Sequence, residues 1–196
     1  MIQKTCLCCV LQMAFVVGIG LLPTVALGQS LVPIPTGKQI ESPPYELQAR
    51  FFCDSNSKDG YVVVKVKLAT DHYLYSLSQA GELATKIEFS LSPTLKINGP
   101  LRPSSTPKIT DIDPVLGDRS EKHFDQIAFV LPIRLISETN PEKCRIDVRI
   151  NGQVCSETGT CQLIRDKVIS AVFVASNQAL GQMLDECLSS DSTVVR

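Results

Sequence analysis

Two cysteines in one short segment, Cys155 and Cys161, have the spacing that thiol–disulfide chemistry needs. Strand-like runs flank them, and the five residues between them include Gly159, which suits a tight turn. In a hairpin the two would face each other, because opposed residues of an antiparallel pair can have Cα atoms about 4.5 Å apart. Closing so short a loop adds little stability, so the bond would be easy to reduce and accessible to other proteins. We therefore predict a redox-active disulfide.

The alternative interpretation of this pair is a structural disulfide in a domain that binds or organises other molecules without catalysis. Most disulfides of exported proteins are structural, so composition alone favours this second interpretation. The two alternatives predict the same covalent bond and differ only in how readily partner thiols reduce it.

The first 28 residues have the pattern of a signal peptide, which would place the chain outside the cytoplasm. Lys4 is the only charge before Lys38, an apolar run spans 10–22, and the small residues that end at Gly28 form a cleavage site. An uncleaved membrane anchor is the alternative, because the uncharged window is long enough to span a bilayer. Both alternatives predict a periplasmic or otherwise extracytoplasmic domain.

The remaining cysteines leave an odd number in the mature chain. Three of the eight cysteines precede residue 28, and five follow it. Cys53 and Cys144 lie at the ends of two predicted strands and could form an inter-strand disulfide or remain two buried thiols. Cys187 lies in the tail and is the candidate for the unpaired thiol. No Cys-x-x-Cys pair occurs and the chain has two histidines, so we expect no metal site.

The pattern of the chain predicts one all-β domain between a linker and a tail. Residues 29–44 are rich in proline and form the linker, and 176–196 form a tail with a possible short helix. Between them, at 45–175, about seven alternating runs separated by turn residues predict an antiparallel β-sandwich. Pro132 interrupts one run, which predicts a bulge or an edge strand there. Residues 93–120 are expected to form a long loop with at most one short strand.

The charge of the chain excludes one class of partner. Its 196 residues carry a net charge of −1, which gives no electrostatic basis for nucleic-acid binding. We also find no phosphate-binding loop and no Ser-His-Asp order, and the expected chemistry needs no small-molecule cofactor.

Three pieces of the sequence, taken in order, resemble the N-terminal periplasmic domain of the thiol:disulfide interchange protein DsbD. They are DHYLY at 71–75, FVLPI at 129–133, and the pair Cys155-x5-Cys161 after an apolar strand. The resemblance covers roughly 45–174, which is most of the predicted mature chain. It implies an immunoglobulin-like sandwich whose two cysteines cycle between dithiol and disulfide.

The resemblance also assigns residues around the cysteine pair. It implies that Cys161 exchanges with partner thiols and that Tyr73 and Tyr75 line the site. The family covers its disulfide with a cap loop, and the matching segment here starts at Asp113, continues through Val115 and Leu116, and lacks an aromatic residue.

His72 stands beside the two tyrosines in the sequence. A nearby imidazolium would lower the pKa of a thiol and raise its thiolate fraction. The alternative is a solvent-exposed turn histidine without a role in the site.

The resemblance implies a place for the domain in an electron relay. Domains of this family take electrons from membrane-embedded and thioredoxin-like parts of the same protein and pass them to periplasmic thiol proteins. The sequence ends at Arg196 without such parts. We therefore expect a separate thioredoxin-like or membrane-embedded thiol reductase as donor, and exported thiol proteins as acceptors.

Overall fold

The computed structural model describes residues 42–54, 57–113, 116–136, 138–175, 181, 182, 184 and 185. The predicted signal peptide, most of the predicted linker, Val115 and Cys187 lie outside this part of the chain, and what the sequence indicates for them stays a prediction. Within the described residues, no helix is long and apolar enough to cross a bilayer.

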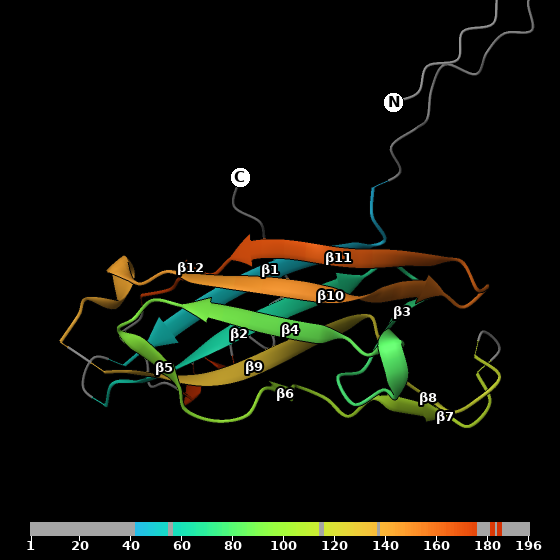
Figure 1. The fold of residues 1–196 in the computed structure, drawn as a ribbon, viewed down its shortest axis with the longest axis horizontal. Coiled ribbons are helices and arrows are strands. Elements are labelled where there is room, and N and C mark those ends of the chain that lie inside the picture. The colour runs from blue at the N-terminus through green and yellow to red at the C-terminus, as the bar shows by residue number, and fades with distance from the viewer. Residues whose placement is uncertain are drawn as a thin grey trace, which may run out of the picture. The chain divides into compact units, whose positions relative to one another are not determined.

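Two packed β-sheets of six strands each form the described domain (Figure 1). The first sheet has the order β12-β1-β2-β9-β5, with β6 also paired to β9. Its strands are β1 Tyr45–Cys53, β2 Asp59–Leu68, β5 Leu95–Ile97, β6 Arg102–Pro103, β9 Gln126–Leu135 and β12 Val172–Phe173. The only parallel pair recorded in the described domain joins β1 to β12.

The second sheet has the order β11-β10-β3-β8-β7, with β4 also paired to β10. Its strands are β3 His72–Tyr75, β4 Lys86–Leu91, β7 Lys108–Thr110, β8 Ser120–Phe124, β10 Ile146–Ser156 and β11 Cys161–Ser170. Two 3₁₀ turns, η1 Gly81–Leu83 and η2 Pro141–Lys143, connect strands. The predicted all-β sandwich is confirmed.

Alternation along the strands produces the main core between the sheets. In β2, Val62, Val64 and Val66 are fully buried in this core, whereas Val63 points to the outer face of the first sheet. Val148 and Ile150 of β10 reach the same core from the second sheet. Each such side chain contributes about 1.5–3 kcal/mol when it leaves water, so this shared core fixes which face of each strand points inward.

The region predicted as a long loop, 93–120, contains more strand than expected. Besides β5, it holds β6 and β7, and β8 begins at its last residue. These strands have two, three and five residues, which is too short for an alternating pattern to stand out. In β8 the buried positions include Ser120, Lys122 and His123, so the hydrophobic signal that marks a strand is missing there.

The edge strand predicted at Pro132 is not found, whereas the pairing of β9 with β5 and β6 is interrupted at this residue. β9 lies between β2 and β5, and its register with β2 is unbroken through the pair Tyr61–Pro132. The Pro132 carbonyl accepts a hydrogen bond from the Asn98 N–H. The nitrogen of a strand residue faces the same side as its carbonyl, so the Pro132 nitrogen, which has no hydrogen to donate, faces the chain between β5 and β6. The neighbouring chain leaves the sheet there, between β5 and β6, and Gly99 fits because a Cβ would lie 3.1 Å from Pro132 Cγ.

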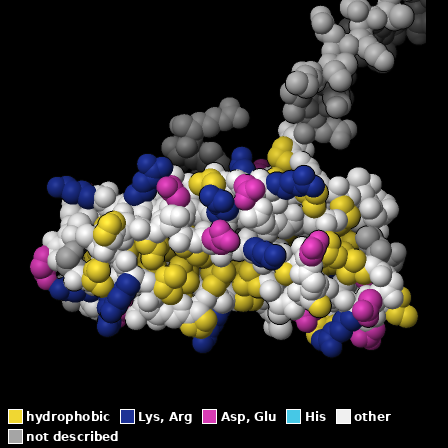
Figure 2. Space-filling model, viewed as in Figure 1, with side chains coloured by type: hydrophobic (Ala, Val, Ile, Leu, Met, Phe, Trp, Pro, Cys, Tyr) yellow, Lys and Arg dark blue, Asp and Glu magenta, His cyan; other side chains and the backbone are white. Residues whose placement is uncertain are grey.

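The surface mixes charge and apolar groups. Figure 2 shows hydrophobic side chains gathered in a band along the middle of one face, with Lys, Arg, Asp and Glu side chains around it. On this face, side chains of opposite charge lie next to each other.

Gly60 provides a test of the packing at one end of the first sheet. A Cβ at this position would lie 2.3 Å from the Phe52 carbonyl oxygen and 2.7 Å from Cys53 Sγ. Gly60→Ala should therefore lower the free energy of unfolding by about 1–3 kcal/mol. Urea denaturation followed by circular dichroism measures the change. Gly181→Ala, where a Cβ meets nothing within 4 Å, is the matched control, and equal midpoints for the two variants would contradict this packing.

Candidate functional site

A disulfide joins Cys155 and Cys161 across the mouth of the β10–β11 hairpin. The two residues are directly opposed in the register, with Cα atoms 4.0 Å apart. The turn between them is closed by a 2.8 Å hydrogen bond from the Ser156 N–H to the Thr160 carbonyl. Gly159 takes a φ of 92°, a left-handed conformation that glycine adopts without a steric penalty.

Strand pairing extends this row across the second sheet. Tyr73 of β3 is opposite Cys155, and Phe124 of β8 is opposite Tyr73. Directly opposed side chains share a face of the sheet, so the disulfide and the two rings lie together. Val154 and Leu74 point the other way into the main core, which leaves the sulfurs on the outer face.

Tyr73 and Tyr75, which the sequence analysis predicted at this site, pack with Cys155 in one buried cluster. Tyr73 and Tyr75 are buried, their rings meet edge to face at a centroid distance of 5.3 Å, and their hydroxyl oxygens are 3.5 Å apart. Burial, followed by the hydrogen bond with Tyr73, raises the pKa of Tyr75 above its ordinary value. Tyr75 is therefore a neutral phenol at physiological pH and adds no charge beside the sulfurs.

The segment after β7 packs against the same cluster. Asp113 is fully buried, and its Oδ1 accepts a 3.1 Å hydrogen bond from the Leu116 N–H. Leu116 packs against the cluster that Tyr73, Tyr75 and Cys155 form, as Cys161 also does. Asp113 lies near the same cluster through its ion pair with Lys122. Val115, also predicted to line the site, lies outside the described residues, and the roles of Asp113 and Leu116 stay predictions.

Lys122 is a member of this site that sequence reasoning missed. Its Nζ lies 2.6 Å from Asp113 Oδ2 and 3.8 Å from the centroid of the Tyr73 ring, and its side chain is 7% exposed. A lysine in a short strand normally indicates a solvated face. The only available signal was its position two residues before Phe124, on the same face of a strand too short to recognise.

His72 has a different environment from the tyrosines that follow it. Its Nδ1 lies 2.7 Å from the Thr70 carbonyl oxygen, which ties the ring to the turn before β3. Successive strand residues point to opposite faces, so His72 is not on the face of Tyr73. Its role in the site stays a prediction.

The two sulfurs differ in exposure. Cys155 is fully buried, and Gln153 Nε2 lies 3.3 Å from its Sγ, whereas Cys161 is half-buried at the start of β11. Cys161 is therefore the more exposed residue of the bonded pair.

Cys53 and Cys144 are free thiols in the structure. Cys53 is the last residue of β1, and Cys144 precedes β10 at the end away from Cys155 (Figure 1). Burial, and to a lesser extent the charge of Cys144, raises the pKa of Cys53 from 9.0 to about 12. The Cys53 thiol is therefore protonated at neutral pH and a poor nucleophile.

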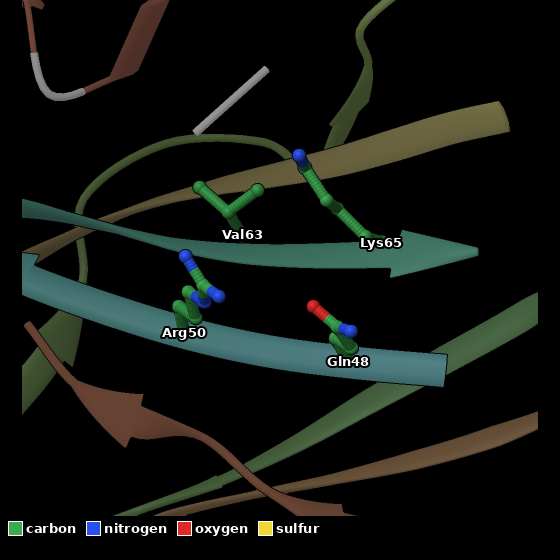
Figure 3. A pocket seen from close by; sticks show the side chains of 4 residues that line it. All are labelled: Gln48, Arg50, Val63 and Lys65. Atoms are coloured by element: carbon green, nitrogen blue, oxygen red, sulfur yellow. The ribbon is translucent and has the colours of Figure 1, made fainter. Parts of the chain in front are cut away.

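A shallow pocket lies on the outer face of the first sheet, away from the disulfide. Its lining comes from β1 and β2: Gln48, Arg50, Val63 and Lys65 (Figure 3). Its cavity volume is about 10 Å³, far below the ~300 Å³ at which small-molecule sites begin. No group of three His, Cys, Asp or Glu side chains that could hold a metal occurs among the described residues.

The fold and the site define a β-sandwich domain with a cysteine pair seated beside two buried tyrosines. The family model described as thiol:disulfide interchange protein DsbD, N-terminal, matches residues 31–172, and the chain belongs to this family. A search of curated proteins finds no match.

Two solved structures are similar to the chain at low sequence identity. The N-terminal periplasmic domain of ScsB from Proteus mirabilis has 16% identity and a TM-score of 0.48, over 69% of this chain and 49% of that one. The chain therefore spans about half the length of that protein. The reduced DsbD N-terminal domain of Neisseria meningitidis has 15% identity and a TM-score of 0.38, over 65% of this chain and 90% of that one.

The raised pKa of Cys53 predicts slow alkylation. At about pH 8 its thiolate fraction should be about 10⁻⁴ in the folded protein, compared with about 10⁻¹ for an ordinary thiol. Iodoacetamide should therefore label the tryptic peptide 51–58 about 1,000-fold more slowly in native protein than in concentrated urea. Mass spectrometry of this peptide gives both rates, and similar rates in the two conditions would show that Cys53 is not buried as described.

Proposed function

We propose that this domain exchanges thiols and disulfides with exported proteins through Cys155 and Cys161. The observation that carries the proposal is the disulfide itself, which is seated across a hairpin with one sulfur buried and the other half-exposed. Membership of the DsbD N-terminal family supports the same chemistry.

The exchange proceeds in two balanced steps. In the oxidised domain, a donor thiolate attacks Cys161 Sγ, the bond to Cys155 breaks, and Cys155 leaves as a thiolate. The second thiol of the donor then attacks the donor's sulfur in the mixed disulfide. This leaves the domain with two thiols and the donor with a disulfide. The reduced domain then passes the electrons on. The Cys161 thiolate attacks the disulfide of an acceptor, and Cys155 then attacks Cys161 Sγ, which restores the disulfide and releases the acceptor as a dithiol.

Burial of Cys155 suits the resolving role. Its position opposite Cys161, with Cα atoms 4.0 Å apart, keeps it beside any mixed disulfide at Cys161. Such proximity makes resolution intramolecular, which gives it a large kinetic advantage over a competing external thiol. Tyr73 and Tyr75 pack with Cys155 in one buried cluster, against which Cys161 also packs.

The partners follow from this chemistry. Two sulfurs carry two electrons without a bound cofactor, so the donor must be another dithiol protein. We propose a thioredoxin-like or membrane-embedded thiol reductase as donor and exported thiol proteins as acceptors, in the periplasm or an equivalent compartment.

A structural disulfide is the second candidate, and the burial of Cys155 favours it. The chain-entropy model assigns about 2 kcal/mol to a bond that closes so short a loop. Both roles require the bond that the structure contains, so the reduction potential has to decide between them.

A redox titration against glutathione separates the two candidates. An exchange disulfide should equilibrate at a potential above roughly −300 mV, whereas structural disulfides lie below that value. The tryptic peptide 150–165 contains Cys155 and Cys161 and no other cysteine, so its alkylated mass reports this pair alone. A potential clearly below roughly −300 mV would contradict the exchange role and favour a structural disulfide.

Two variants, each with one cysteine of the pair replaced by serine, test which sulfur exchanges with partner thiols. Cys155→Ser leaves the more exposed Cys161, which should form a mixed disulfide with oxidised glutathione about tenfold faster than the Cys161→Ser variant does. Mass spectrometry of the tryptic peptide 150–165 follows the added glutathione, so glutathione on the other cysteines is not counted. The Cys155→Ser variant should also trap a thioredoxin-like protein from an extract of the compartment. Faster reaction of the Cys161→Ser variant would reverse the two roles.

A further inference from the structure

We propose that the free edge of β11 binds an extended, cysteine-bearing segment of an acceptor protein as an added antiparallel strand, with the acceptor's cysteine opposite Cys161. The inference rests on the proposed function, because it names the part of the acceptor that the exchange site receives. The backbone groups that hold this segment belong to Cys161 and Leu163, the first and third residues of β11.

β11 is an edge strand that begins at Cys161, the more exposed cysteine of the pair. It ends the second sheet, and β10 is the only strand paired with it in the described part of the chain (Figure 1). An edge strand presents unpaired backbone N–H and C=O groups, which are the groups that a further strand binds. The strand that carries Cys161 therefore has room for a second neighbour.

The register of the hairpin decides which backbone groups face the open edge. The Ser156 N–H donates to the Thr160 carbonyl, so these two residues form a hydrogen-bonded pair. The two kinds of antiparallel pair alternate, so the next pair, Cys155 with Cys161, is the closer, non-hydrogen-bonded kind, and its Cα separation of 4.0 Å agrees. The N–H and C=O groups of Cys161 therefore point away from β10, and alternation gives Leu163 the same orientation.

An added strand would form a hydrogen-bonded pair at Cys161. Directly opposed residues of such a pair have Cα atoms about 5.5 Å apart, which is a common separation in disulfides. They also share one face of the sheet, so the acceptor's sulfur would lie on the same face as Cys161 Sγ. The acceptor's cysteine thus reaches Cys161 without a change in the hairpin.

The direction of the exchange reaction points to the same edge. When Cys155 attacks Cys161 Sγ in the mixed disulfide, the bond between Cys161 and the acceptor breaks and the acceptor leaves as a thiolate. The entering and leaving sulfurs lie roughly in line, so the acceptor's sulfur lies on the side of Cys161 away from Cys155. Cys155 belongs to β10, and the side of β11 away from β10 is the open edge.

The rest of this edge has features that oppose strand pairing, whereas the part beside the disulfide lacks them. The register with β10 shifts near Asp166, which takes a φ of 45°, and such a bulge bends the strand. Residues 165–167 are also charged and exposed, which discourages a further strand. The stretch 161–164 is uncharged, and Leu163 is 48% exposed. This stretch fits an acceptor with an apolar residue two positions before its cysteine, opposite Leu163.

The experiment measures whether backbone hydrogen bonds hold a peptide at Cys161. The probe is a synthetic pentapeptide with blocked ends, Thr-Val-Thr-Cys-Thr, whose valine would lie opposite Leu163. The Cys155→Ser variant, with glutathione on Cys161, is equilibrated with the probe, whose thiolate attacks Cys161 Sγ and releases glutathione as a thiol. The tryptic peptide 150–165 then carries either probe or glutathione, and mass spectrometry gives the ratio.

N-methylation at neighbouring residues of the probe separates strand addition from ordinary thiol exchange. The valine N–H would donate to the Leu163 carbonyl, so methylation of this nitrogen should lower the exchange equilibrium constant about fivefold. The N–H of the central threonine would point away from β11, so the probe methylated there is the matched control and should stay within about twofold of the parent. In concentrated urea the three probes should exchange equally, because the edge is lost on unfolding.

Two further substitutions, each combined with Cys155→Ser, test the protein side of the same hydrogen bonds. Leu163→Pro removes the N–H that points to the open edge, which an edge strand tolerates, and should lower the exchange constant of the parent probe about fivefold. Leu163→Ala keeps this N–H and should lower it about twofold at most. Circular dichroism checks that both variants fold, and the methylated probes still decide the question if Leu163→Pro does not.

The outcomes are distinct. Equal effects of the two methylations, or no effect of either, overturn the proposal, as does a preference that persists in urea. A second copy of this chain is the other occupant of the edge, and sedimentation of the oxidised protein as a dimer that Leu163→Pro dissociates would overturn the proposal in its favour. The exchange constant is measured at Cys161 whatever the potential of the native disulfide. A structural result in the glutathione titration would therefore contradict the proposed function and leave the test of the edge unaffected.

Discussion

The register of the second sheet is the constraint on which the site depends. Val154 and Leu74 are buried in the main core, and this places their neighbours Cys155 and Tyr73 on the opposite face. A shift of one residue would turn the sulfur into the core and a core valine out of it. The apolar contacts between the two sheets therefore determine which face of the second sheet carries the disulfide.

The outer face then needs its own means of excluding water. A small cluster of aromatic rings surrounds the disulfide there, separate from the main core. Charged groups in it are tolerated because Lys122 and Asp113 neutralise each other and because Tyr75, with its raised pKa, stays neutral. This separation means that changes at the disulfide need not disturb the packing between the sheets.

The same chain keeps its other described cysteines in a contrasting environment. Cys53 and Cys144 are free thiols associated with the main core, at the ends of β1 and β10 away from the hairpin turn. Burial raises the pKa of Cys53 to about 12, which suppresses its reactivity at neutral pH. Position in the sandwich, rather than residue type, thus decides the environment of each sulfur.

The sequence by itself determined the features that local pattern encodes. The alternation of the long strands predicted the sandwich, and the spacing of Cys155 and Cys161 with a turn between them predicted that they would face each other. The tertiary structure alone decided the rest. Lys122 meets Asp113 through the β7–β8 hairpin and meets Tyr73 only when β8 pairs with β3, and the strand itself is too short and too polar to be recognised. Pro132 fits within β9 because the neighbouring chain leaves the sheet between β5 and β6. No local pattern in the sequence encodes that departure.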